Sequence, residues 1–563
     1  MDAVPRPSAS APPDRHTAGP LRTREQLRSL RPDLLERYDA ALPAARAAIL
    51  GRLLGAVGRE ALPGLVSRGT GEAAFTRTAG GDRSARGDGR AGAGGRWAEA
   101  GGHERGATEP GRAGDAPGGI VLRFEAGATA PFFPGVAGLA VAARFGGAQR
   151  SIVDPGELVR LLWGEVPLAG EIDNSVANLA LARAVATGRP WLPEPGPDAL
   201  GVVEQQVVDG HPLHPCCRTR GGMSVADVLA YAPEHSPVIR LRRLRVPAGQ
   251  WFGDGPPVLY AHPWQAQRLL QRYPWLHDDG PTAPVRPLMS LRTVAPLDGG
   301  PHVKTAVDVQ MTSAVRTVSP AAVHNGPLLS RLLERLTADL PIDVLAETGA
   351  GAVIVDGEPQ RHLAHLFRRA PRLADGEVAV PLAWPGAVPM WSGRGDDPYE
   401  IMGLIATLLV GPAVRLLARG VALEAHGQNT LLVLRGGRPV RVLYRDLGGV
   451  RVSPARLRAA GVDAPPLLGD LPSDDPAVLR TKLAAAVLGT VAQQLIADFG
   501  RHGADERRLW AIVAAAIRDT GTADAPHLLR DPLPVKATTA MRLAADPLDD
   551  LWASLDNPMA AHG

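Results

Sequence analysis

Cysteine is almost absent from this sequence. Of its 563 residues, only Cys216 and Cys217 are cysteines, and they are adjacent. Neighbouring cysteines cannot crosslink distant segments, so the sequence excludes a disulfide framework and favours a reducing compartment. No apolar run follows the basic N-terminus, so a secretory signal peptide is not expected. We therefore expect a cytoplasmic protein.

An excess of charge of one sign is also lacking. The chain carries 61 basic and 58 acidic side chains, and its net charge is +3. Nucleic-acid binders neutralise many phosphates with clustered lysine and arginine, so this small excess predicts no nucleic-acid partner.

Long hydrophobic runs are missing as well. The longest, Ile401–Val414, is interrupted by Gly403, Gly411 and Pro412. It is shorter than the roughly 18 to 20 residues that a membrane-spanning helix needs. The sequence therefore predicts no association with a membrane.

Apolar residues are nevertheless plentiful, at 45% of the chain, and its length is enough for two or three packed units. Residues 1–20 are rich in Pro, Ser and Ala and are predicted to form a disordered tail. A helix is expected from Thr23, where Thr23 and Gln26 could form a capping box. Short strands and helices then alternate, which predicts an α+β fold with a Pro-rich joint near 381–389 and a helix-rich C-terminal block.

Residues 79–119 differ from the rest in composition, because 14 of these 41 residues are glycine and arginine is frequent. Such a stretch buries too little apolar surface to offset its chain entropy, so we interpret it as a disordered insertion. An RGG-like RNA-binding segment is the alternative. Phe75 and Trp97 are the only aromatic residues nearby, which is few for base stacking.

The C-terminal block carries a polar loop followed by a hairpin. The loop reads Glu424-Ala-His426-Gly-Gln428-Asn429, and the strands 431–434 and 440–444 are joined by a Gly-Gly turn. Asp446 follows the second strand, at the same edge as the loop. Carboxylate and amide oxygens at one edge suit Mg²⁺ with nucleotide phosphates, an arrangement that kinases also use. A kinase needs an Asp in the loop as its base, and this loop has none; a purely structural N-cap with a strand-end Asp is the other alternative.

Cations and hydroxyls recur on a second group of extended segments. Ser290, Arg292 and Thr293 precede Lys304, and Arg316 follows it at the end of another alternating stretch. Side chains on one face of such strands can line a cleft and bind an anion, with Arg supplying a planar fork and Lys a point charge. Solvated strand faces have a similar pattern.

Two further segments are rich in His or Arg. His211 and His214 each precede a proline, which excludes a regular helix there and with it a zinc pair; together with Arg218 and Arg220 they suggest an anion pocket. We interpret His262 as part of a buried His–Trp packing pair. The arginines at 240–245 predict an edge strand whose charges prevent pairing with another chain.

Taken together these segments resemble the siderophore synthetases that work independently of nonribosomal peptide synthetases (NRPS), the aerobactin-synthetase or IucA/IucC type. The order and spacing match that family over about residues 160–460. The motifs that carry the resemblance are GHPLHPCCRTRGG (210–222), APEHSP (232–237), HPWQ (262–265), SLRT (290–293), HVKTAVDVQMTSAVRT (302–317), EAHGQN (424–429) and YRDLGG (444–449). Two features depart from the family: Arg218 stands where a Lys is usual, and the insertion 79–119 has no counterpart.

The resemblance implies a hand-like architecture with a thumb (21–170), fingers (171–375) and a helix-rich palm (376–563) with a kinase-like hairpin edge. It also implies roles for single residues, in a homodimer that uses ATP and Mg²⁺. The catalytic residues would be Arg316, His426 and Lys304. ATP would be bound by His214, Ser290, Arg292, Thr293, Lys304, Gln428 and Asn429. The substrate carboxylate would be held by Arg316, His426 and Arg292, and the metal by Asp446, Asn429 and Glu424.

The expected reaction joins a small polycarboxylic acid, citrate or a citrate derivative, to an amine or hydroxyl acceptor through an acyl-adenylate. A carboxylate is already a nucleophile, so the first step needs no base, which explains a loop without Asp. A kinase-like phosphotransferase, which would release ADP, and a non-catalytic binding relative are the alternatives.

Overall fold

The computed structural model describes residues 19–77, 96–97, 119–186, 188, 190–312, 314–546 and 550–562. The predicted disordered tail, 1–20, lies outside these ranges except for its last two residues. The predicted insertion 79–119 also lies outside them, except for Gly119 and for β3 (Arg96–Trp97). The backbone of β3 pairs in parallel with β25 (Leu551–Leu555).

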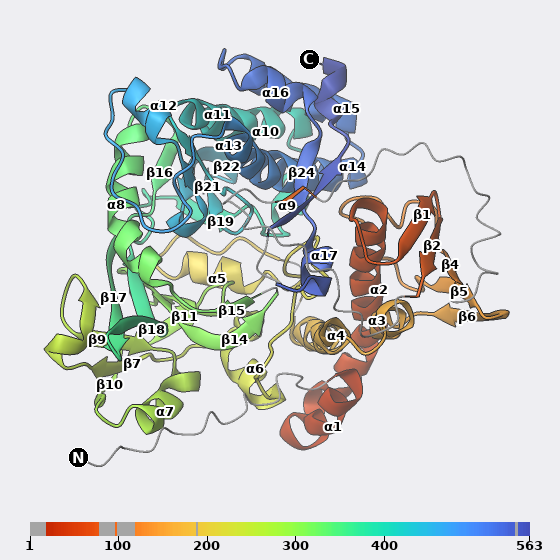
Figure 1. Cartoon of the computed structure of the whole chain (residues 1–563), viewed down its shortest axis with the longest axis horizontal. Coiled ribbons are helices and arrows are strands. Elements are labelled where there is room, and N and C mark those ends of the chain that lie inside the picture. The colour runs from red at the N-terminus through yellow and green to blue at the C-terminus, as the bar shows by residue number, and fades with distance from the viewer. Residues whose placement is uncertain are drawn as a thin grey trace.

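The N-terminal part combines helices with a five-stranded antiparallel sheet in the order β1-β2-β4-β5-β6 (Figure 1). The predicted capping box at Thr23 is wrong: the first helix begins at Pro20 and Thr23 is buried within it. The fixed φ of proline suits the first helical position, so Pro20 sets the start. The elements are α1 (Pro20–Leu30), η1 (Pro32–Leu34), α2 (Leu35–Arg59), β1 (Leu65–Gly69), β2 (Glu72–Thr76), β4 (Gly119–Arg123), β5 (Val141–Phe145), β6 (Ala148–Ile152), α3 (Pro155–Trp163) and α4 (Pro167–Val185).

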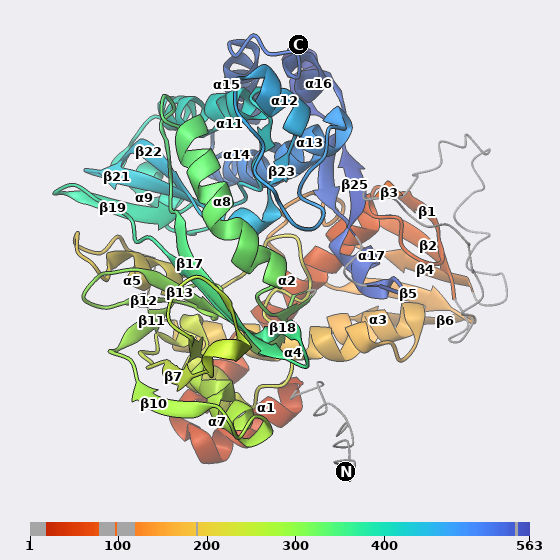
Figure 2. The same cartoon turned by 60° about the vertical axis from the view of Figure 1, so that its left-hand side comes forward.

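The middle part is built on a six-stranded sheet in the order β11-β12-β13-β18-β17-β8. Helix α8 crosses one face of this sheet, as Figure 2 shows. The elements of this part are α5 (Ala199–Gln205), α6 (Val225–Tyr231), η3 (Pro233–His235), β7 (Arg242–Arg245), β8 (Trp251–Gly253), β9 (Val258–Ala261), α7 (Pro263–Arg272), β10 (His277–Pro281), β11 (Val285–Pro287), β12 (Thr293–Pro296), β13 (His302–Thr305), β14 (Val307–Met311), β15 (Ala314–Arg316), α8 (Pro320–Leu336), β17 (Glu347–Val355) and β18 (Glu358–Arg368).

The arginine-rich strand is not an edge strand, contrary to the prediction. Strand β7 is the central strand of a small sheet ordered β10-β7-β9. Its arginines have acidic partners on β10: Arg242 pairs with Asp278, and Arg245 lies 2.6 Å from Asp279. Two of the three arginines of β7 are therefore neutralised by the neighbouring strand, and Arg243 donates to the backbone carbonyl of Asp279.

The C-terminal part packs helices against a four-stranded sheet in the order β16-β22-β21-β19. The predicted hairpin is confirmed, with the turn residues Gly436 and Gly437 both at positive φ, 56° and 81°, as a tight two-residue turn requires. The elements are β16 (Ile342–Val344), β19 (Glu377–Pro381), α9 (Ala387–Arg394), α10 (Pro398–Ile405), η5 (Ala406–Val410), α11 (Gly411–Ala418), β20 (Val421–Ala422), β21 (Thr430–Arg435), β22 (Arg438–Tyr444), η6 (Leu447–Gly449), β23 (Arg451–Val452), α12 (Pro454–Ala459), α13 (Pro476–Leu483), η7 (Ala484–Ala492), α14 (Gln493–Arg501), α15 (Glu506–Arg518), α16 (Ala525–Arg530), β24 (Leu533–Lys536), α17 (Thr538–Leu543) and η8 (Pro558–His562).

The prediction that the apolar run 401–414 belongs to a helix too short to span a membrane is wrong. The helix continues through its glycines and proline, because the π-helical turn η5 directly before α11 accommodates Pro412, which has no N–H. Within the ranges that the structure describes, three helical stretches could cross a membrane by length and composition alone: Pro32–Arg59, Pro398–Ala418 and Pro476–Arg501. Between 61% and 67% of each apolar window is buried inside the protein, so core packing accounts for this composition.

The C-terminal residues return to the N-terminal part. Glu60, at the end of α2, is fully buried and accepts hydrogen bonds from the backbone N–H groups of Thr539 (2.9 Å) and Ala540 (2.8 Å). Arg542 on α17 pairs with Glu171 on α4, with Nε 2.8 Å from Oε2. Residues of α17 and of strands β24 and β25 share one apolar core with α2 and α4.

Candidate active site

The centre of the candidate site is an ion pair between two distant segments. Lys304 on β13 is 8% exposed, and its ammonium contacts the carboxylate of Asp446, which follows β22. Burial lowers the pKa of Lys304, against the attraction of Asp446. Burial alone would raise the pKa of Asp446, because it disfavours the charged carboxylate. The positive charges of Lys304 and then Arg368 outweigh this effect and hold the pKa well below its usual range. The sequence-predicted residues Lys304 and Asp446 are thus brought together as an ion pair.

Asp446 is one of several residues near the site that have a left-handed backbone. Its φ is 69°, and Leu291 (64°) and Thr312 (55°) are also in this region. Left-handed non-glycine residues are strained and cluster at functional sites. Leu291 lies inside the Ser-Leu-Arg-Thr motif, and Thr312 contacts Arg316.

Two buried residues of the site were missed by sequence reasoning. Arg368, at the end of β18, has its Nη2 3.9 Å from Asp446 Oδ2 and 3.8 Å from Glu347 Oε1. Its Nε and Nη2 make no hydrogen bond with any described residue. Glu347 accepts a hydrogen bond of 3.4 Å from the backbone N–H of Leu447, directly after Asp446. Both are single charged residues in ordinary strands, and no local pattern marks them.

The Ser-Leu-Arg-Thr motif forms the loop before β12. The hydroxyl of Ser290 accepts a hydrogen bond from the backbone N–H of Thr293 (3.2 Å), which fixes the turn. Arg292 donates to the carbonyl of Thr317 at 2.5 Å. Burial lowers the pKa of Arg292, while Asp446 opposes this shift. Arg292 is therefore close enough to Asp446 for their charges to interact, and Thr293 is paired in register with Lys304.

Arg316, at the end of β15, is the second arginine of this cluster. It donates to the hydroxyl of Thr312. Burial, followed by repulsion from Arg292, lowers the pKa of Arg316 to about 10. Neither Arg292 nor Arg316 forms an ion pair with any residue that the structure describes. The site therefore holds two guanidinium groups without a carboxylate of their own.

Each His-Pro dipeptide holds its imidazole in one tautomer. In all three, Nδ1 of the histidine accepts a hydrogen bond from the backbone N–H two residues later, with distances of 3.2 Å for His211, 3.0 Å for His214 and 3.2 Å for His262. An imidazole that accepts at Nδ1 carries its proton on Nε2. Burial, then repulsion from His211, lowers the pKa of His214 well below its usual value. His214 is therefore a neutral Nε2–H donor.

The predicted His–Trp packing pair is confirmed only in the burial of His262. It is fully buried, and Trp264 is 8% exposed. The ring that its imidazole contacts, however, is that of Tyr231, at 5.3 Å between centroids.

Arg218 and Arg220 do not form the anion pocket that the sequence suggested. Arg220 donates to both carboxylate oxygens of Glu234, at 2.9 and 3.1 Å. Arg218 lies 3.4 Å from the same carboxylate and donates to the carbonyls of Val207 and Val208. Both arginines are buried and hold the chain together. The unusual Arg218 therefore makes contacts inside the protein.

The polar loop 424–429 lies against the C-terminal end of the chain. Glu424 Oε1 is 3.2 Å from Lys482 Nζ and 3.8 Å from Lys536 Nζ, and both lysines escaped the sequence analysis. Burial alone would raise the pKa of Glu424, but these ammonium groups lower it to about 2. Gly449 packs on this carboxylate so closely that any side chain there would collide with it.

The remaining loop residues are placed by hydrogen bonds. Asn429 donates weakly from Nδ2 to the carbonyl of Glu424 (3.4 Å), and the carbonyl of Gln428 accepts from Arg445 at 2.9 and 3.1 Å. Burial lowers the pKa of His426 against the attraction of Glu424 and Asp446, so this imidazole is neutral at pH 7. Among the described ranges, no group of three or more His, Cys, Asp or Glu side chains could hold a metal ion by itself.

Two family models match this chain. The IucA/IucC family model matches residues 200–251 and 254–383, which include the Lys304 and Arg316 strands. A model described as ferric iron reductase FhuF-like transporter matches residues 404–549, which cover the polar loop, the hairpin and the C-terminal helices.

Relatives and solved structures agree with the first model. The chain is 26% identical to staphyloferrin A synthase of Staphylococcus aureus over 427 residues, which cover 64% of this chain and 73% of the relative. The petrobactin biosynthesis protein AsbB of Bacillus anthracis has a similar fold, with a TM-score of 0.72 at 16% identity over 94% of this chain and 98% of the other. ATP-bound aerobactin synthetase IucA of Klebsiella pneumoniae gives 0.67 at 18% identity over 92% and 99%.

The motif order, the cluster around Lys304 and Asp446 and these similarities agree. The chain is an enzyme of the ligase class, and its similarities in sequence and fold are to the IucA/IucC type of NRPS-independent siderophore synthetase.

Proposed function

We propose that this enzyme activates a small polycarboxylic acid as its adenylate with ATP and transfers the acyl group to an amine or hydroxyl. One observation carries the proposal: Arg292 and Arg316 lie near the Lys304–Asp446 pair, and neither forms an ion pair with a carboxylate in the described part of the chain. A guanidinium group that is largely shielded from water and has no counter-charge destabilises the folded protein unless an anion binds it. Triphosphate and carboxylate are anions of the required kind.

The triphosphate would lie along the Ser-Leu-Arg-Thr loop and β13. Ser290 and Thr293 offer a hydroxyl and backbone groups, and Arg292 and Lys304 supply positive charge. His214 would donate from Nε2, and being neutral it binds a phosphate oxygen without adding charge. Arg368, with two unsatisfied N–H donors, extends this set.

Two of the three residues predicted to bind Mg²⁺, at the edge of the sheet where the hairpin ends, suit that role. The carboxylate of Asp446 and the amide oxygen of Asn429 are hard oxygen ligands, and Mg²⁺ usually takes its other ligands from phosphates and water. Glu424, also predicted as a ligand, is engaged by Lys482 and Lys536, which suits a supporting role better. When bound, Mg²⁺ neutralises charge on the phosphates.

Arg316 and Arg292, with His426, would orient the substrate carboxylate toward the α-phosphorus of ATP. A carboxylate oxygen forms the new bond to phosphorus while the bond to pyrophosphate breaks. The amine or hydroxyl then attacks the acyl carbon, AMP leaves with the bonding electrons, and the acceptor releases its proton to water. The main barrier to the first step is charge crowding, which fixed cations lower by electrostatic preorganisation. No residue has to remove a proton in that step.

Relatives indicate the substrates. Other S. aureus proteins similar to this chain are named D-ornithine–citrate ligase and L-2,3-diaminopropanoate–citrate ligase. We therefore infer citrate or a citrate derivative as the acyl donor and an amine as the acceptor, in siderophore biosynthesis. A cytoplasmic homodimer without a nucleic-acid or membrane partner, with thumb, fingers and palm regions, stays a prediction.

The test is product analysis with ATP, Mg²⁺, hydroxylamine as surrogate acceptor and a panel of acids that includes citrate. Acid-dependent AMP, pyrophosphate and hydroxamate are expected. ADP in place of AMP would indicate a phosphotransferase, and no turnover with any acid would contradict an active synthetase for this substrate class.

A further inference from the structure

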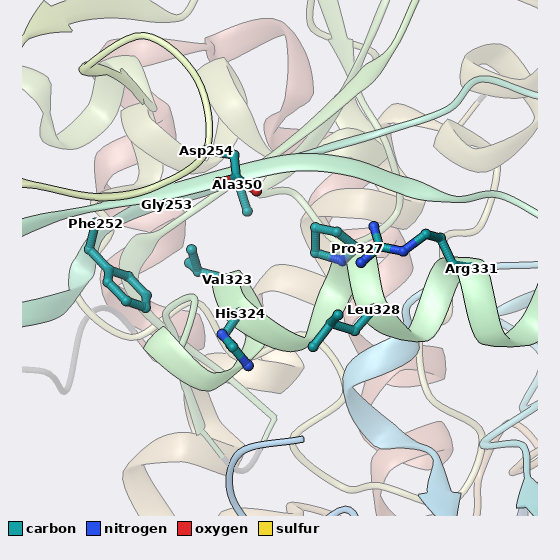
Figure 3. A pocket seen from close by; sticks show the side chains of 9 residues that line it. All are labelled: Phe252, Gly253, Asp254, Val323, His324, Pro327, Leu328, Arg331 and Ala350. Atoms are coloured by element: carbon teal, nitrogen blue, oxygen red, sulfur yellow. The ribbon is translucent and has the colours of Figure 1, made fainter. Parts of the chain in front are cut away.

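A groove of about 380 Å³ lies between helix α8 and the edge strand β8, with β17 behind it (Figure 3). It is separate from the cluster around Asp446. Its apolar lining comes from both walls and includes Phe252, Val323, Leu328 and Ala350. Its volume suits a small molecule.

Two unpartnered charges of opposite sign border this groove. Asp254 follows β8 on one wall, and Arg331 extends from α8 on the other (Figure 3). Both are exposed, and neither makes an ion pair or hydrogen bond with any residue in the described ranges. The α8 residues that line the groove run from Val323 to Arg331, about 12 Å along the helix axis at 1.5 Å per residue.

Helix α8 also packs on the sheet face that carries Lys304. Lys304 is paired in register with Leu366, and Leu366 with Ala350. Residues opposite one another in paired strands point to the same face. Leu366 and Ala350 share an apolar cluster with Val323 of α8. The groove and the catalytic lysine therefore lie on one face of one sheet.

The same helix is bonded directly to the site. The hydroxyl of Ser330 accepts a hydrogen bond of 2.8 Å from the backbone N–H of Glu347. Gly326 lies so close to the Glu347 carboxylate that a Cβ there would be 2.6 Å from Oε2. Glu347 in turn contacts Leu447 N–H and lies 3.8 Å from Arg368. A shift of α8 would therefore act on Glu347 through the Ser330 hydrogen bond and the close approach of Gly326, and through Glu347 on the residues next to Asp446.

We propose that this groove binds a small zwitterion, with an amine and a carboxylate separated by an apolar body, and that its occupancy is coupled to nucleotide binding through α8. The carboxylate would bind the guanidinium of Arg331 and the amine the carboxylate of Asp254, while the hydrocarbon covers Phe252 and Leu328. The site lies outside the catalytic cluster, so its ligand is an effector of the enzyme.

Calorimetric titration of the full chain with 6-aminohexanoate, hexanoate and hexylamine tests the binding site. The zwitterion is expected to bind about tenfold more tightly than either singly charged compound, as for one charge-assisted contact. Arg331→Gln should remove its advantage over hexylamine, and Asp254→Asn its advantage over hexanoate. Arg335→Gln, an exposed arginine one turn further along α8, is the matched control and should change nothing.

Equal affinity for the three compounds, no binding of the zwitterion, or a preference that survives both substitutions would overturn the site. Coupling is tested by titrating ATP with and without saturating 6-aminohexanoate, and the probe with and without ATP. Linkage requires the same fold-change in both directions, expected to be about fivefold or more. An unchanged ATP affinity would overturn the coupling. The probe titration without ATP stands even if the proposed adenylation fails.

Discussion

The guanidinium of Arg445 lies 2.6 Å from the carboxylate of Glu204, and 241 residues separate them in the chain. Both side chains are buried. The same guanidinium donates twice to the carbonyl of Gln428. Because Arg445 directly precedes Asp446, this ion pair joins the middle part of the chain to both the polar loop and the end of the hairpin.

Glu204→Gln should lower the free energy of unfolding by about 3 kcal/mol, because it leaves a buried guanidinium without its counter-charge. Urea denaturation measures the change. The control is Asp470→Asn, which removes the exposed partner of Arg451 and should cost about 1 kcal/mol or less. Equal effects of the two substitutions would contradict a structural role for the buried pair.

Lys304→Ala or Arg316→Ala should lower the rate of acid-dependent AMP formation by about 100-fold or more, because each removes a fixed cation from the site of charge crowding. Circular dichroism should show an unchanged fold. Arg243→Ala, on an exposed position of β7, is the control and should keep full activity. Normal AMP formation by either site variant would refute the anion-binding assignment.

The stability that Glu424 contributes should depend on pH. Its folded pKa, about 2, is lower than its ordinary value of 4.5, so the contribution is complete above about pH 4.5 and is lost as pH falls toward 2. We expect the free energy of unfolding of the wild-type protein to exceed that of Glu424→Gln by about 3 kcal/mol at pH 6.5 and by less at pH 3.5. Urea denaturation at both pH values measures this. A difference that does not shrink in acid would contradict the lysine pairing.

His214 should stay neutral, with its proton on Nε2, at pH 6. Burial lowers its pKa, and Nδ1 is occupied by the backbone N–H of Cys216. Nitrogen-15 spectra of histidine-labelled protein, assigned with His214→Gln, report the tautomer directly. A doubly protonated signal at pH 6 would show that the backbone contact does not fix the ring.

The parts of the site that the sequence predicted are those with local patterns. Lys304 stands in an alternating strand, Asp446 follows a hairpin with a Gly-Gly turn, and Arg292 belongs to a short motif with two hydroxyls. Each pattern depends on neighbours within a few residues. The resemblance to a family then gave the order in which the segments combine.

The missed residues depend on contacts between distant segments. Arg368, Glu347, Lys482 and Lys536 each enter the site from a different element, without a motif around them. Long-range pairing also explains the errors. Strand β7 was expected at an edge because its partner β10 could not be paired with it by sequence alone. The sequence suggests Arg218 as a ligand-binding residue because its contact with Glu234, 16 residues away, has no local pattern.

The contact between Glu60 and the backbone of residues 539 and 540 also constrains when the protein can fold. During synthesis Glu60 is made about 480 residues before the backbone N–H groups that bind it. The buried Glu171 is made 371 residues before its partner Arg542. Until then Glu60 has only its neighbour Arg59 as a side-chain partner, and Glu171 has no arginine to pair with, so a closed N-terminal core would hold incompletely satisfied carboxylates. The N-terminal part can therefore reach its final packing only after synthesis has passed residue 542, so its folding depends on a segment that is made much later.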